Sequence, residues 1–77
     1  MNIDTALDSL DYATNNDKIV IDTKNSNINF NAENVDTIEQ EDDNTIFISL
    51  TDNKLFIIDA NSIELIRISE KNGGETA

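Results

Sequence analysis

Apolar positions follow a helical period at the start of the chain and a strand period after residue 18. In residues 2–14 the apolar side chains recur every three or four positions, on one face of a short helix: Ile3, Ala6, Leu7, Leu10 and Ala13. Either Asn2 or Asp4 suits the N-cap of this helix. The polar residues 14–17 lack periodicity and predict the loop that leaves it.

From residue 18 to residue 68, short runs rich in β-branched residues alternate with turn residues. This pattern predicts about six short, mainly antiparallel strands. The stretch 28–32 alternates strictly between apolar and polar side chains, which is typical of a strand with one buried face. The strands and the helix together predict an α+β domain. We expect a single sheet or a small barrel, with the helix covering an open face.

The strand region carries the same pattern twice, at a spacing of 27 to 28 residues. Each unit, 18–41 and 45–68, reads strand, turn, strand, Ala-x-x-apolar-x-x-Ile, strand. Two copies are too few for a solenoid, so the pattern favours an internal duplication; the alternative is an accidental match between common strand patterns. We expect one domain over residues 1–72 and a flexible tail over 73–77. The aligned pairs are Ile19 with Ile46, Ile21 with Ile48, Ile28 with Leu55 and, after a one-residue slip, Ala32 with Ala60.

The alternation also predicts which strand residues are buried. The expected core comprises Ile21, Ile28, Phe30, Ile48, Leu55, Ile57 and Ile66. Further apolar residues fall out of phase with these, and we expect them to form a second apolar face covered by the helix, by closure of the sheet or by another subunit: Val20, Phe47, Phe56 and Ile58. A 77-residue chain has a thin core, so self-association is the expected reinforcement.

Acidic residues outnumber basic ones and are unevenly placed. The chain has 16 Asp and Glu against 5 Lys and Arg, and residues 1–17 and 33–43 hold ten acidic residues and no basic one. This charge predicts repulsion from nucleic acids and anionic membranes, and attraction to the basic surface of a nucleic-acid-binding protein. The alternative is that the acidity serves only solubility. The candidate partner-binding residues are Asp4, Asp8, Asp11, Glu39, Glu41, Asp42 and Asp43.

The residue types needed for most catalytic and metal sites are missing. The chain has no His and no Cys, which excludes disulfides, thiolate metal sites and the usual nucleophilic triads. The stretch 39–44 is rich in carboxylates but lacks the EF-hand pattern, so we expect a hairpin loop there, with no metal and no cofactor. The basic residues are scattered without interleaved aromatic residues, which argues against direct nucleic-acid binding.

No apolar run approaches the roughly 20 residues that cross a bilayer, and the N-terminus lacks the pattern of a signal peptide. Asn and Ile each occur 12 times, which fits an AT-rich bacterial or phage genome. The sequence therefore predicts a non-enzymatic inhibitor encoded by a phage or mobile element. It would act in the host bacterial cytoplasm as a nucleic-acid mimic of the anti-CRISPR or anti-restriction type. The alternative is a homo-oligomeric structural or ligand-sequestering protein.

Overall fold

The computed structural model describes residues 1–69, which form one α-helix and six strands. Two short 3-10 helices, η1 (Ala32–Asn34) and η2 (Ala60–Ser62), precede the third and sixth strands. The predicted α+β class is confirmed, and the expected tail over 73–77 lies outside the described residues. The other elements are α1 (Ile3–Ala13), β1 (Lys18–Thr23), β2 (Asn27–Asn31), β3 (Val35–Gln40), β4 (Thr45–Leu50), β5 (Leu55–Asp59) and β6 (Ile63–Ser69).

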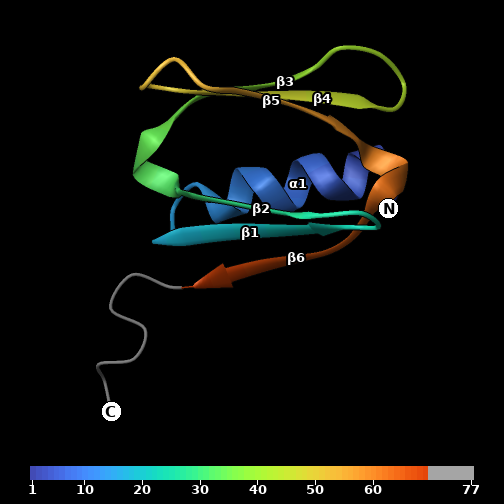
Figure 1. Cartoon of the computed structure of the whole chain (residues 1–77), viewed down its shortest axis with the longest axis horizontal. Coiled ribbons are helices and arrows are strands. Elements are labelled where there is room, and N and C mark those ends of the chain that lie inside the picture. Colours follow the sequence, from blue (N-terminus) through green and yellow to red (C-terminus); the bar gives the residue numbers. More distant parts are fainter. Residues whose placement is uncertain (70–77) are drawn as a thin grey trace.

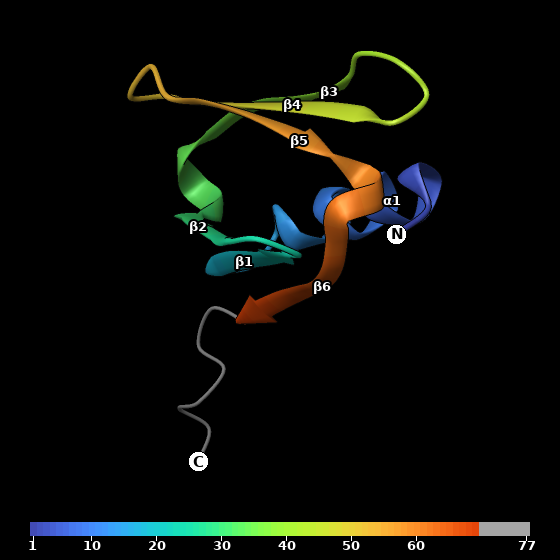
Figure 2. The ribbon, with the colours of Figure 1, turned by 45° about the vertical axis from the view of Figure 1, so that its right-hand side comes forward.

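The strands form two antiparallel sheets, with the strand orders β2-β1-β6 and β3-β4-β5. The sheets lie one above the other, and η1 and η2 connect them at opposite ends of the molecule (Figures 1 and 2). The helix α1 lies between the sheets and packs against β3, β4 and β6 (Figure 1). The strands β2 and β5 approach each other through Phe30 and Phe56, whose stacked rings have centroids 5.7 Å apart.

The backbone confirms the internal duplication and shows that the two units exchange their third strands. Each unit gives its first two strands to one sheet and its third strand to the other sheet. Equivalent backbone hydrogen bonds hold both units: Ala32 N–H donates to the Asp17 carbonyl at 3.0 Å, and Ala60 N–H donates to the Asn44 carbonyl at 2.7 Å. The third strand of each unit pairs with the first strand of the other unit: β3 pairs with β4, and β6 pairs with β1. The two units therefore form one folded body.

The two hairpin turns differ by one residue, which corrects the alignment of the units. In the first hairpin Thr23 N–H donates to the Ser26 carbonyl, and in the second Leu50 N–H donates to the Lys54 carbonyl, each at 2.8 Å. The second loop is therefore one residue longer. It ends at Asn53, whose φ of 72° is the left-handed conformation expected after a type I turn in a three-residue loop. The slip between the units thus lies in the turn, before β5, and not after Leu55, within β5, as predicted.

This turn reverses the predicted orientation of β5. Leu55 and Ile57 point outward, with 51% and 63% of their surface exposed, so their predicted burial was wrong. Phe56 and Ile58 point inward instead, because they lie opposite Ile48 and Ile46 of β4. All four residues from Leu55 to Ile58 are apolar, so the alternation within β5 contains no information about its buried face.

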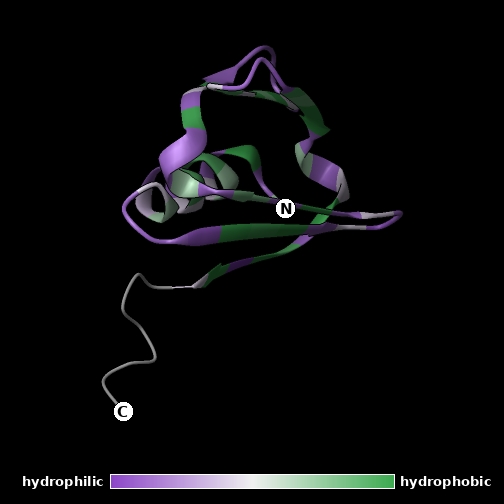
Figure 3. Ribbon diagram, turned by 60° about the vertical axis from the view of Figure 1, so that its left-hand side comes forward, coloured by the Kyte–Doolittle hydropathy of each residue, from purple (hydrophilic) through white to green (hydrophobic). Residues whose placement is uncertain are grey.

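The core lies between the sheets and includes one face of the helix, while the turns are hydrophilic (Figure 3). Ile28 and Ile66 are half-buried and pack against this core. Val20 and Phe47 are half-buried on the outer faces of different sheets, because their strand neighbours point inward. The predicted second apolar face is therefore not one surface. The buried residues are Ala6, Leu10, Ala13, Ile19, Ile21, Phe30, Ala32, Ile46, Ile48, Leu50, Ile58, Ala60 and Ile63.

The helix begins and packs as its sequence predicts. Of the two candidate caps, Asn2 is the one observed: its Oδ1 accepts a hydrogen bond from Asp4 N–H at 2.8 Å. Ala6, Leu10 and Ala13 have no exposed surface. The side of α1 that faces away from the core is exposed to solvent, and the aspartates of the helix lie there.

Candidate acidic interface

The helix presents three of the candidate carboxylates to solvent. Asp4, Asp8 and Asp11 are all exposed, because the apolar residues of α1 occupy the face turned to the core. Asp8 and Asp11 line a hollow together with Leu7 and with Ile38 of β3. The fold therefore brings two helical carboxylates beside the second acidic block of the sequence, at the strand β3.

The strand β3 contributes a different carboxylate from the one predicted. Ile38 packs against the core, so Glu39 alternates to the outer face of the sheet, where it lies opposite Phe47. Asp36 instead lines a hollow with Asp11 and Ile38. Asp36 is skipped in the pairing of β3 with β4, which makes it the extra residue of a β-bulge. We call Asp8, Asp11 and Asp36 the α1–β3 acidic face.

The remaining candidate carboxylates lie in the turn between β3 and β4. Glu41, Asp42 and Asp43 are exposed there. Asp42 and Asp43 line a separate hollow with Asp59, at the end of β5. We call these four residues the turn group. The structure thus divides five of the seven predicted carboxylates between two acidic areas, and Asp4 and Glu39 lie outside both. Asp59 is a member that the sequence pattern did not indicate, because it comes from a distant strand.

Asp42 also has a structural role in its turn. Its Oδ1 accepts hydrogen bonds from Asn44 N–H at 2.9 Å and Thr45 N–H at 2.8 Å. These donors, that of Asn44 first, hold the pKa of the Asp42 carboxyl below its usual range. A substitution meant to test charge alone should therefore leave Asp42 in place.

Of the basic residues that the structure describes, Lys18, Lys54 and Arg67 lie outside both acidic areas. The Lys24 N–H donates to the Ser62 carbonyl at 3.0 Å, so Lys24 lies beside η2, the short helix that follows Asp59 of the turn group. Lys18 and Lys54 line a groove between β2 and β5, above the stacked rings of Phe30 and Phe56. Arg67 lies on β6, on the outer face of the sheet β2-β1-β6. No lysine or arginine lines the hollows of the two acidic areas within residues 1–69. We refer to the two areas together as the acidic side.

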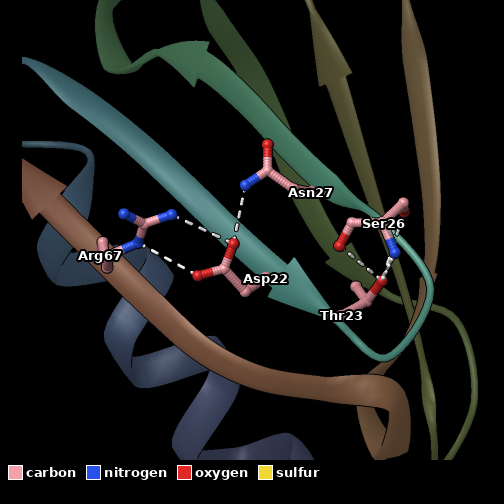
Figure 4. A network of polar contacts seen from close by, with 5 residues as sticks. All are labelled: Asp22, Thr23, Ser26, Asn27 and Arg67. Atoms are coloured by element: carbon pink, nitrogen blue, oxygen red, sulfur yellow. Dashed lines mark hydrogen bonds and ion pairs between the residues drawn. The ribbon is translucent and has the colours of Figure 1, made fainter.

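Arg67 belongs to a network that joins the three strands of its sheet (Figure 4). Its Nε donates to Asp22 Oδ2 at 3.1 Å, its Nη2 donates to Asp22 Oδ1 at 3.2 Å, and Asn27 Nδ2 donates to Asp22 Oδ1 at 2.7 Å. Asp22 and Arg67 are 45 residues apart, so no local pattern could have paired them. The network explains why the only arginine is not part of a free basic patch.

We expect the Asp22 network to stabilise the fold in a pH-dependent way. The hydrogen bond from Asn27, and then that from Arg67, lower the pKa of the Asp22 carboxyl from its usual value. A lowered folded-state pKa gives a contribution that is complete above the usual carboxyl pKa and is lost as the pH falls through the lower folded value. Melting curves of wild type and Asp22→Asn should therefore differ at neutral pH and converge in acid. A difference independent of pH would contradict this assignment.

Within residues 1–69 no polar or charged residue is buried, and no three acidic side chains come close enough together to hold a metal ion. The single helix of this region is too short and too polar to cross a membrane. The carboxylates of both acidic areas are exposed groups at the surface.

Comparison of the chain with protein-family models, with curated proteins and with solved structures finds no match in any of the three.

Proposed function

We propose that the chain is a small, non-catalytic inhibitor that docks by its acidic side onto a basic nucleic-acid groove of another protein. The supporting observation is that no lysine or arginine within residues 1–69 forms an ion pair with either acidic area. The ion pairs within residues 1–69 are Lys54 with Asp52 and Arg67 with Asp22, and both lie outside these areas. The α1–β3 acidic face and the turn group are therefore free to meet lysine and arginine side chains of a partner.

A protein groove that holds nucleic acid presents cations at the spacing of phosphates, and exposed carboxylates on a rigid fold can occupy the same positions. The chain would then act as a nucleic-acid mimic and would itself bind neither nucleic acid nor an anionic membrane, since both are negatively charged. An inhibitor of this kind fits an anti-CRISPR or anti-restriction factor of a phage or mobile element, acting in the host bacterial cytoplasm. The net charge of −11 would also speed association with such a target.

Charge reversal tests this proposal. One variant combines Asp8→Lys with Asp11→Lys, and a second combines Glu41→Lys with Asp43→Lys, which leaves the turn contacts of Asp42 intact. We expect each variant to keep the fold, because all four side chains are exposed. We expect each to associate with the target about 10- to 1,000-fold more slowly at low salt, because electrostatic steering is lost. Added salt should reduce this difference, since it screens charges beyond about 8–10 Å.

The matched control combines Asp17→Lys with Glu64→Lys. It changes the net charge by the same amount, but both residues are exposed positions outside the two acidic areas. The binding partner is found by capture from bacterial lysate, and inhibition is measured on a panel of RNA-guided nucleases and restriction endonucleases. A target that binds the control as weakly as the two test variants would show that only net charge matters. If all three variants bind and inhibit like wild type at low salt, the acidity serves solubility and the proposal is wrong.

The alternative function, a homo-oligomeric structural or ligand-sequestering protein, is favoured by a separate observation. Leu55 and Ile57 are large apolar side chains with about half or more of their surface exposed. Salt distinguishes the two functions: binding through the acidic side weakens as salt rises, whereas association through apolar side chains persists.

A further inference from the structure

The strand β5 ends the sheet β3-β4-β5 and is apolar on its outer side. Leu55 and Ile57 project from that side, and Ile57 lies directly opposite Phe47 of β4. Exposed large hydrophobic residues on an edge strand favour pairing with another strand, and natural edge strands usually carry features that prevent it. β5 has neither a proline nor an inserted charge between Leu55 and Ile58.

The outer backbone groups of β5 are also free within residues 1–69. Leu50 N–H donates to the Lys54 carbonyl and Ala60 N–H donates to the Asn44 carbonyl, so the even-numbered residues of this strand bond toward β4. In an antiparallel ladder, alternate residues bond to opposite sides. The N–H and C=O groups of Leu55 and Ile57 therefore point to the open edge. The same residues thus offer both unpaired backbone groups and exposed apolar side chains.

The charge distribution allows this edge to accept a second copy of so acidic a chain, because the only acidic residue of β5 is Asp59 at its end. The α1–β3 acidic face lies at the other edge of the same sheet, because the strand order is β3-β4-β5. If two β5 strands paired, the two β3 strands would be separated by five strand spacings, about 24 Å. That distance exceeds the screening length of about 8–10 Å, so the acidic faces of the two copies would scarcely repel each other.

We propose that two copies of the chain pair their β5 strands antiparallel and form one continuous six-stranded sheet. In the pairing that best matches the side chains, Leu55 of each copy lies opposite Ile57 of the second copy. This places Phe47, Ile57 and the second Leu55 in one apolar row on the outer face. It also keeps the two Asp59 carboxylates about 20 Å apart along the strands. A pairing shifted by one residue on each copy would instead set Asp59 opposite Leu55. This proposal is independent of the proposed function.

Sedimentation at increasing protein concentration, in low and high salt, tests the pairing. Wild type should form a dimer that persists in high salt. Ile57→Lys should raise the dimer dissociation constant about tenfold or more, a change of about 1.4 kcal/mol, because it places a lysine in the apolar row. The matched control is Leu65→Lys, the same kind of change at a residue 50% exposed on β6 of the other sheet. The control should dimerise like wild type, and both variants should melt close to wild type.

Disulfide trapping tests the register of the two β5 strands. The chain has no native cysteine that could form competing cross-links. Directly opposed residues have Cα atoms about 5.5 Å apart, within disulfide range. A mixture of Leu55→Cys and Ile57→Cys should therefore cross-link far more than either variant alone. A wild type that stays monomeric at all concentrations would overturn the proposal. A dimer lost in Leu65→Lys, or cross-linking mainly of Ile57→Cys with itself, would also overturn it. If monomeric wild type binds the captured target and Ile57→Lys does not, the β5 edge belongs to the target interface.

Discussion

Replacing Ile48 with alanine is expected to lower the free energy of unfolding by about 2–5 kcal/mol. Ile48 lies in the middle of β4 and has no exposed surface; it faces Ile38 on one neighbouring strand and Phe56 on the other. The substitution removes three buried carbon atoms and leaves a cavity that two rigid sheets cannot easily fill. A domain of this size has only about 4–12 kcal/mol of stability, so the variant should be largely destabilised.

The control for this prediction is Ile57→Ala, which removes the same atoms from an adjacent strand. Ile57 is 63% exposed, so its truncation should change the stability of the monomer by no more than about 0.5 kcal/mol. Urea unfolding of both variants at low protein concentration measures the difference. Equal losses of stability in the two variants would mean that Ile57 does not point outward. No loss of stability in Ile48→Ala would mean that Ile48 does not point into the core.

The second large effect is expected from Leu10→Ala in the helix, again about 2–5 kcal/mol. Leu10 has no exposed surface, and α1 packs between β3 and β6, the strands that the two units exchange. Truncating Leu10 weakens the packing of α1, the helix that lies between the two sheets at β3 and β6. We therefore expect the sheets and the helix to unfold together in one transition.

Tyr12→Ala is the matched control on the same helix, because Tyr12 is 61% exposed and its truncation should change stability by no more than about 0.5 kcal/mol. Far-ultraviolet circular dichroism during thermal unfolding gives both melting temperatures. If Leu10→Ala melts like Tyr12→Ala, the helix contributes little and the two sheets hold together without it.

The residues of the acidic side show which properties of this site are local and which depend on strand pairing. The high density of carboxylates in residues 1–17 and 33–43 is a local property, and the helical period correctly separated Asp8 and Asp11 from the apolar face of α1. The bulge at Asp36 and the outward turn of Glu39 depend on how β3 pairs with β4. Pairing is a contact between distant segments, so no periodicity within β3 could reveal which carboxylates join the helix.

The sequence by itself determined the elements, the helix face and the duplication, because each of these is encoded by neighbouring residues. Local period identified α1 and the six strands, and the alanines at 32 and 60 were equivalent positions of the two units. Tertiary structure decided what local period leaves ambiguous. Leu55 to Ile58 are all apolar, so only the extra turn residue and the pairing with β4 selected Phe56 and Ile58 for the core. The exchange of third strands was likewise decided in three dimensions, since each unit buries its apolar face only by packing on the other.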